Sequence, residues 1–243
     1  VELFLKLPSR RKKGRHNIMK IGLIITGAGS SRRYQSKTSK LFETIDGQPI
    51  LRHTYLAFQN IATIQQTIIT LHPDHIAKGQ QMFKKEANAV QLIEGGETRK
   101  ESVQNAFSRL NPDIDWVMIH DGARPIVSEA LIRRVIDATQ TNSAIIPGLP
   151  VSDTIKRVKE KSVVETVSRD DLVTVQTPQL FRKDWLSEAY RTPMAKEATD
   201  EAMLLEHCNR PVTIVPGDAK NIKVTYPEDL VLAQTFITGL NAS

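Results

Sequence analysis

The chain has 243 residues, of which 40% are hydrophobic and 25% are charged, as in ordinary globular proteins. This composition excludes an intrinsically disordered chain and a collagen-like repeat, and the single cysteine excludes a disulfide scaffold or a Cys-rich zinc site. No apolar run reaches the ~18 residues of a membrane-spanning helix, so we expect no membrane partner. We predict a single α/β domain over residues 19–240.

The net charge of +6 is concentrated at the start of the chain. Residues 1–18 hold six basic residues and one acidic residue, so the remaining 225 residues carry a net charge of only +1. We expect residues 1–18 to be a disordered or non-native extension before Met19, the alternative being a basic arm that binds polyanions. Because the body lacks a basic stripe, we expect no nucleic-acid partner. The tail does not have the layout of a signal peptide, and the lone Cys208 fits a reducing, cytoplasmic location.

Short β-branched runs alternate with helical stretches along the chain, a pattern typical of βαβ units and a parallel sheet. The run Ile21–Ile25 is apolar without interruption, as expected of a strand buried on both faces. Thr98 with Glu101, and later Ser128, carry the start signals of two helices. We therefore predict a Rossmann-like α/β fold with a mostly parallel, twisted sheet, whose further strands are 67–71, 90–93, 116–120, 144–147 and 212–215.

The segment at about 150–175 departs from this alternation. Its valines recur at every second position around a Lys-Glu-Lys-Ser turn, which predicts a β-hairpin with two polar faces. An isolated two-stranded hairpin is marginally stable in water, so we expect it to project as an arm that packs on something else. The simplest partner is a second copy of the chain, which predicts a homodimer formed through this β-arm.

The first predicted strand runs into the sequence TGAGSSRRYQSKTSKLF, which is rich in small residues. Backbone N–H groups at Gly27, Ala28 and Gly29 are placed to cradle phosphates. The loop matches neither a P-loop nor a dinucleotide-binding fingerprint, because it has no Gly-Lys pair and no third glycine at the required spacing. Four cations suited to a triphosphate follow within a dozen residues, although a solvated basic loop explains them equally well: Arg32, Arg33, Lys37 and Lys40.

This loop resembles the signature loop of nucleotidyltransferases that join a sugar or polyol phosphate to a nucleotide. More narrowly, it resembles that of the 2-C-methyl-D-erythritol 4-phosphate cytidylyltransferase family, which reads roughly A-A-G-x-G-x-R followed by a lysine. Arg33 and Lys40 match the arginine and lysine in spacing, whereas Ser31 replaces the second glycine. The resemblance spans roughly residues 19–240 and implies a nucleotidyltransferase fold with Arg33 and Lys40 as catalytic groups. It also implies that CTP binds at Gly27, Ala28 and Gly29.

Two further motifs of the same family follow in the same order. GGETRKESV resembles the G-G-x-x-R-x-x-S segment that holds the cytosine base, which implies CTP contacts from Gly95, Gly96 and Ser102. HDGARP resembles H-D-A-A-R-P, which implies Mg²⁺ binding by Asp121 and substrate binding by Arg124. A carboxylate at the end of a strand suits a magnesium ion that bridges phosphate oxygens.

The later motifs concern the reacting phosphates and the second substrate. GDAKNIKVT resembles the closing G-x-x-x-N-x-K motif of the family, which implies a catalytic role for Lys223. The segments PVSDTIKR, TVSRDD and TVQTPQLF imply substrate contacts from Thr154, Arg169 and Thr177, with Arg169 supplied by the arm of the partner subunit. ATDEAMLLE resembles the T-D-E-A segment and adds Thr199 to the substrate contacts.

Taken together, the resemblance implies transfer of CMP from CTP to 2-C-methyl-D-erythritol 4-phosphate, with release of pyrophosphate and with Mg²⁺ as the cofactor. A phosphate monoester has a second pKa of ~6, so the attacking group is largely dianionic at neutral pH and needs no histidine base. Ribitol 5-phosphate is the alternative substrate, because a cytidylyltransferase of the same fold shares most of these motifs. A nucleotide-binding regulator without catalysis is a further alternative, favoured only by Ser31.

Overall fold

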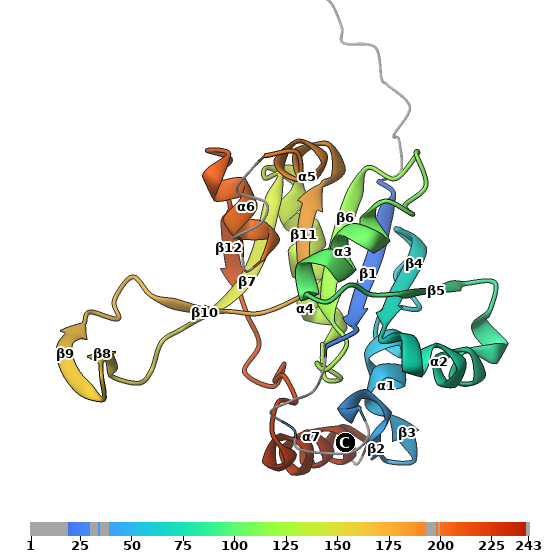
Figure 1. Ribbon diagram of the computed structural model, residues 1–243, viewed down its shortest axis with the longest axis horizontal. Helices are drawn as coiled ribbons and strands as arrows, with labels where there is room; N and C mark the ends of the chain where they lie inside the picture. The colour runs from blue at the N-terminus through green and yellow to red at the C-terminus, as the bar shows by residue number, and fades with distance from the viewer. Residues whose placement is uncertain (1–18, 30–33, 35–38, 193–197, 199, 242–243) are drawn as a thin grey trace, which may run out of the picture.

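The computed structural model describes residues 19–29, 34, 39–192, 198 and 200–241. Within these residues, a central eight-stranded sheet carries helices on both of its faces (Figure 1). Across the sheet the strands are β10 (Val173–Val175), β7 (Ala144–Pro150), β11 (Gln179–Arg182), β6 (Trp116–Asp121), β1 (Ile21–Gly27), β4 (Ile64–Leu71) and β5 (Val90–Glu94), while β12 (Thr213–Pro216) also pairs with β7.

Most strands of this sheet run in the same direction. β1 is parallel to both β4 and β6, β4 is parallel to β5, and β12 is parallel to β7. β11 is antiparallel to both β6 and β7, and β10 is antiparallel to β7. The predicted α/β fold with a mostly parallel sheet is confirmed, and each strand expected from the sequence overlaps an observed one. β11 is not among the predicted strands. β10 lies within the segment of about 150–175 that is predicted to form the projecting hairpin, and this part of the prediction is wrong, because β10 pairs with β7 in the central sheet.

The apolar run of β1 is buried on both faces of the sheet, as its sequence predicts. Leu23 and Ile25 belong to the core on one face and Ile24 to the core on the other, and none of the three is exposed. The first face is covered by α1 (Ile50–Leu56), α2 (Ile76–Met82), α4 (Glu129–Asp137) and α7 (Pro227–Asn241), and the second by α3 (Arg99–Phe107), α5 (Lys183–Ala189) and α6 (Glu201–His207).

β10 and β11 are two halves of one interrupted strand that runs along β7. The five steps from Val175 to Leu180 lie opposite only three steps of β7, from Gly148 to Ile145. Two extra residues are therefore accommodated between the halves, in a segment that contains Thr177. An irregularity of this kind re-aims side chains next to a site, and here it lies beside the end of β6.

The hairpin predicted near residues 150–175 is formed by β8 (Ile155–Lys159) and β9 (Ser162–Val167). Its turn residues Glu160 and Lys161 have φ values of 48° and 69°, as a two-residue hairpin loop requires. Figure 1 shows this hairpin standing away from the sheet. A smaller hairpin joins β2 (Thr44–Ile45) to β3 (Gln48–Pro49). None of the helices described has both the length and the apolar character needed to cross a bilayer.

Candidate active site

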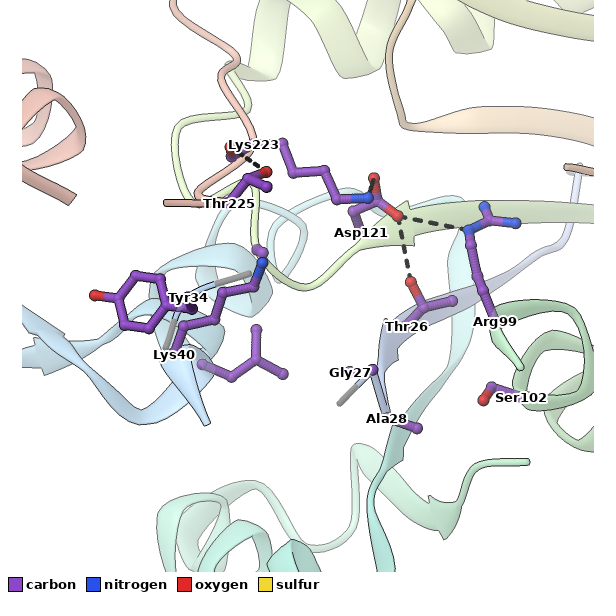
Figure 2. Close-up of a pocket in the computed structure, with 13 residues that line it drawn as sticks. Thr26, Gly27, Ala28, Tyr34, Lys40, Arg99, Ser102, Asp121, Lys223 and Thr225 are labelled. Atoms are coloured by element: carbon purple, nitrogen blue, oxygen red, sulfur yellow. Dashed lines mark hydrogen bonds and ion pairs between the residues drawn. The ribbon is translucent and has the colours of Figure 1, made fainter. Parts of the chain in front are cut away.

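A cavity of about 530 Å³ opens at the carboxyl ends of β1 and β6, which are neighbours at the centre of the sheet (Figure 2). Ligands of open α/β sheets bind at this edge. Seven of the thirteen lining residues are among those predicted from the sequence. The lining residues are Thr26, Gly27, Ala28, Gly29, Tyr34, Lys40, Leu41, Arg99, Ser102, Asp121, Ala123, Lys223 and Thr225.

The predicted phosphate loop forms one wall of this cavity. β1 ends at Gly27, whose N–H donates to Thr70 Oγ1 at 3.3 Å. A side chain does not fit there, because a Cβ atom at Gly27 would lie 2.8 Å from the carbonyl oxygen of Thr70. Ala28 and Gly29 continue the wall with almost no side chain, so a ligand can approach the backbone closely. Lys40 begins a short 3-10 helix and lies across the cavity from Ala28 (Figure 2).

Asp121 is a buried carboxylate surrounded by three cations. Its oxygens lie 2.9 Å from Lys223 Nζ, 3.3 Å from Arg124 Nε and 3.6 Å from Arg99 Nε. Burial alone raises the pKa of Asp121, but the positive charges of Lys223, Arg99 and Arg124 outweigh it and hold that pKa well below the usual range. The carboxylate is therefore ionised at every physiological pH, and two of the three cations around it, Lys223 and Arg99, line the cavity.

A chain of hydrogen bonds behind Asp121 fixes the end of β6. The Asp121 N–H donates to Thr177 Oγ1 at 3.0 Å, and this hydroxyl lies 3.0 Å from His120 Nδ1. His120 Nε2 lies 3.2 Å from the carbonyl oxygen of Arg124. Every partner is satisfied when the Thr177 hydroxyl donates to Nδ1 and Nε2–H donates to the carbonyl, which is the neutral imidazole. Burial lowers the pKa of His120 to about 4, so this histidine is uncharged at neutral pH and cannot act as a general acid.

The predicted base-binding wall consists of the first turn of α3, where Ser102 lines the cavity, and the loop after β5, whose Gly95 and Gly96 lie behind Ser102 and do not line the cavity. Thr98 caps α3 through the capping box that the sequence predicts. The Ser102 hydroxyl accepts from the Gly96 N–H at 3.1 Å and donates to the Thr98 carbonyl at 2.9 Å, so it ties the loop to the helix. A Cβ atom at Gly95 would lie only 2.2 Å from Ala28 Cβ. Gly95 therefore lets the base-binding wall approach the phosphate loop.

Lys223 lies on the loop between β12 and α7, and the neighbouring Asn221 anchors this loop. Asn221 is fully buried, and its Nδ2 donates to the Thr177 carbonyl at 2.8 Å. Its own carbonyl accepts from Arg124 Nη1 at 2.7 Å. Arg124, predicted to bind substrate, is thus held by Asp121 and Asn221 and does not line the cavity. Thr177 likewise lies behind the cavity, so substrate contacts from these two residues stay predictions.

Two other predicted substrate residues lie away from the cavity of their own chain. Thr154 and Arg169 are exposed at the base of the hairpin, where Arg169 donates to the carbonyl of Ser152. Neither lines the cavity. The segment 1–18, Ser31, Arg32, Arg33, Lys37 and Thr199 lie outside the described residues.

Arg99, for which the sequence predicts no role, lines the cavity as the first residue of α3. Its guanidinium lies between Asp121 and the buried carboxylate of Glu201. A signal was present, because Arg99 is the arginine of the GGETRKESV segment. Thr26 and Thr225 also line the cavity. No local sequence pattern marks these threonines, whose positions depend on how β1 and α7 pack.

The donors at the cavity fit a cation shared between the protein and a phosphate ligand. Asp121 is a carboxylate at the edge, with Thr26 Oγ1 3.4 Å from its Oδ1. In the part of the chain that the structure describes, no group of three His, Cys, Asp or Glu side chains converges to hold a metal unaided. Mg²⁺ typically binds through one or two carboxylates and substrate phosphates, so a single aspartate suffices.

The chain matches the family model of 2-C-methyl-D-erythritol 4-phosphate cytidylyltransferase over residues 21–239. It is 39% identical over 221 residues to the protein of that name from Bacillus mycoides, covering 88% of this chain and 96% of the relative. It is 38% identical over 216 residues to a bifunctional IspD/IspF enzyme from Desulfotalea psychrophila, covering 88% of this chain and 56% of that enzyme. The crystal structure of 4-diphosphocytidyl-2C-methyl-D-erythritol synthase from Anaerococcus prevotii aligns with a TM-score of 0.80 at 29% identity, covering 91% of this chain and 100% of that one. The chain therefore belongs to the 2-C-methyl-D-erythritol 4-phosphate cytidylyltransferase family of nucleotidyltransferases.

Proposed function

We propose that this protein transfers CMP from CTP to 2-C-methyl-D-erythritol 4-phosphate, giving 4-diphosphocytidyl-2-C-methyl-D-erythritol and pyrophosphate. An oxygen of the substrate phosphate attacks the α-phosphorus of CTP. The new P–O bond forms as the bond to the bridging oxygen breaks, and pyrophosphate leaves with that electron pair. Family membership supports the substrates. One observation carries the chemistry: Lys223 Nζ lies 2.9 Å from the buried carboxylate of Asp121 at the edge of the cavity.

CTP is expected to lie along the two walls that meet at Gly95. The loop Gly27–Gly29 would face the triphosphate, because it presents backbone with almost no side chain. The first turn of α3, with Ser102, would hold the cytosine. This orientation places the α-phosphorus near the carboxyl end of β6, close to Asp121 and Lys223.

The reaction needs charge stabilisation more than proton transfer. Its nucleophile is already a phosphate dianion at neutral pH, and the neutral, buried His120 is hydrogen-bonded to other protein groups. The difficulty is that two anions must meet while negative charge builds up on the transferring phosphorus. Lys223, from the loop before α7, and Lys40, from the short 3-10 helix, both supply positive charge to the cavity (Figure 2), and the same role is proposed for Arg33.

Mg²⁺ is the cofactor that this donor set would accept. Asp121 would hold it together with phosphate oxygens of CTP, and the ion would neutralise charge on the triphosphate. Asp121 already forms ion pairs with three cationic side chains, so binding of a divalent ion would displace at least one of them. Lys223 is the most exposed of the three, with 38% of its side chain accessible, so it is the partner best able to move to a phosphate.

We further infer a homodimer in which the hairpin of each subunit completes the other's site. Val158, Val163 and Val164 on the hairpin are 55%, 62% and 59% exposed, an arrangement that favours burial against another chain. Arg169 does not reach the cavity of its own chain. Carried by the hairpin into a partner's cavity, its guanidinium could grip the polyol phosphate with two hydrogen bonds. We place the reaction in the cytoplasm, because the lone Cys208 fits a reducing compartment.

The deciding experiment incubates the full chain with CTP and Mg²⁺ and follows pyrophosphate release with each of two acceptors. Release with 2-C-methyl-D-erythritol 4-phosphate, and little with ribitol 5-phosphate, is the expected result. Release with ribitol 5-phosphate alone would refute the proposed substrate and retain the chemistry. No release with either acceptor, in a protein that binds CTP, would refute the enzymatic function.

A further inference from the structure

Glu201 is a fully buried carboxylate outside the cavity, and the mechanism above does not use it. It lies in the first turn of α6, next to the capping residue Asp200. Its oxygens lie 2.9 Å from Arg99 Nη1 and 3.4 Å from the hydroxyl of Tyr190. An ion pair buried in this way rarely adds more stability than apolar residues of similar size. Its specific geometry therefore points to a role in placing Arg99.

The guanidinium of Arg99 is shared unequally between two carboxylates. Nη1 lies 2.9 Å from Glu201, within hydrogen-bonding distance, whereas Nε lies 3.6 Å from Asp121. Burial alone lowers the pKa of Arg99, but Glu201 and Asp121 raise it well above its ordinary value, so Arg99 is always charged. Figure 2 shows Nε directed at Asp121 while the far end of the guanidinium turns away from it. Glu201 thus holds the far end of Arg99 and prevents a close pair with Asp121.

The position of Arg99 links the two halves of the CTP site. Arg99 and Ser102 lie on the first turns of the same helix, α3, and both line the cavity. Asp121 lies on the other side of Arg99, at the end expected to hold the phosphates. A guanidinium held between these points can reach the nucleotide, because 28% of its side chain remains exposed.

We propose, on the basis of the function proposed above, that Glu201 is a positioning residue for CTP binding that acts through Arg99. It neutralises part of the Arg99 charge and holds the guanidinium on the nucleotide side of the cavity. Without the negative charge of Glu201, Asp121 would be the nearest carboxylate, and Arg99 would close onto it. That movement would remove a donor from the nucleotide and occupy the carboxylate that the magnesium ion needs.

A purely structural role for Glu201 makes a different prediction. Tyr190, at the end of α5, contacts Glu201 of α6 and also stacks edge-on against Phe107 of α3, at 5.1 Å between ring centroids. If Glu201 merely held these three helices together, its loss would weaken CTP binding whether or not Arg99 were present. If Glu201 acts through Arg99, its loss would matter only when Arg99 is present.

The test is a double-mutant cycle of Glu201→Gln and Arg99→Gln in the full chain, read as the CTP dissociation constant by calorimetry with Mg²⁺ and no acceptor. Glu201→Gln preserves the shape of the side chain and is expected to weaken CTP binding about tenfold. Arg99→Gln is expected to weaken it by at least as much, and the double variant no further. The matched control is Glu206→Gln, the same change at an exposed site on α6, with unchanged affinity.

Two results would overturn this proposal. One is Glu201→Gln binding CTP within twofold of the unmodified chain. The other is that Glu201→Gln weakens CTP binding by the same factor in the Arg99→Gln variant as in the unmodified chain. If Glu201→Gln does not fold, Glu201→Asp is the second variant, because it keeps the negative charge and shortens the reach of the side chain to Arg99. Its affinity for CTP is expected to fall about threefold. An unchanged affinity would again overturn the proposal. Because the cycle measures binding without turnover, a chain that binds CTP but transfers no CMP refutes the proposed function separately.

Discussion

Replacing Gly95 with alanine tests whether the close contact between the two cavity walls matters for catalysis. A Cβ atom at this position would lie 2.2 Å from Ala28 Cβ and 2.6 Å from Ser102 Oγ. Carbon atoms pack at about 3.5–4.0 Å, so the walls must separate by roughly 1.5 Å. Overpacking of this kind costs about 1–3 kcal/mol. In a domain of this size, that corresponds to a fall in Tm of roughly 2–12 °C.

The effect on turnover should exceed the effect on stability. A displacement of about 1 Å in a reacting geometry is enough to lower the rate ~10²-fold. We therefore expect Gly95→Ala to reduce kcat/KM for CTP by about two orders of magnitude, measured by pyrophosphate release at a temperature well below its Tm.

Gly239→Ala is the matched control, because nothing lies within 4 Å of a Cβ atom built there. Gly239 lies in α7, where alanine is favoured over glycine by about 1 kcal/mol, so the control should be slightly more stable and fully active. If Gly95→Ala retained kcat/KM within threefold of the unmodified chain, the two walls would not need their close approach, and the assignment of Gly95 to the CTP site would fail.

Three further predictions concern the cations, the buried histidine and the hairpin. Lys223→Ala should lower kcat by about 10²–10³-fold with little change in Tm, and activity within threefold of the unmodified chain would remove Lys223 from the mechanism. Burial lowers the pKa of His120 from 6.5 to about 4, so between these pH values the unfolded chain binds a proton that the folded chain does not. The free energy of unfolding should therefore fall by about 3 kcal/mol as the pH drops through this window. In thermal denaturation, the Tm of His120→Gln should depend less steeply on pH than the Tm of the unmodified chain. Equal slopes of Tm against pH in the two proteins would contradict this account. Arg169→Ala should raise the KM for the polyol phosphate and leave that for CTP unchanged, and Val163→Asp should give a monomer by sedimentation with the same defect. A fully active monomer would refute the role of the hairpin.

The sequence predicts the strands that carry a recognisable apolar run and misses a short strand whose pairing depends on the rest of the fold. Ile21–Ile25 is recognisable because burial on both faces demands a continuous apolar run. β11 has four residues, and only its pairing with β6 and β7 makes it a strand. β10 is three residues long and exposed throughout, with Val173 and Val175 37% and 40% accessible, so no alternation of buried and exposed residues separates it from the hairpin that precedes it.

Site residues that are marked by their own stretch of sequence can likewise be predicted, whereas those placed by distant residues cannot. Asp121 and Gly27 are recognisable because each comes just after a predicted strand, at the edge where ligands bind. Arg99 gains its place from Glu201, a residue 102 positions later in the chain, and no local pattern encodes that pair. The irregular strand that aims Thr177 at Asp121 is likewise invisible before the register with β7 is known.

The central position of β1 has a consequence for synthesis on the ribosome. Thr26 pairs with Asp121, so one edge of this mostly apolar strand has no partner until 95 further residues have been made. At a synthesis rate of about 5–20 residues per second, that interval is roughly 5–20 s, during which the unpaired edge of the strand can pair with other chains. β4 emerges earlier and can cover the opposite edge. Slowing translation between β4 and β6 should therefore increase aggregation and chaperone dependence more than an equal pause after β6.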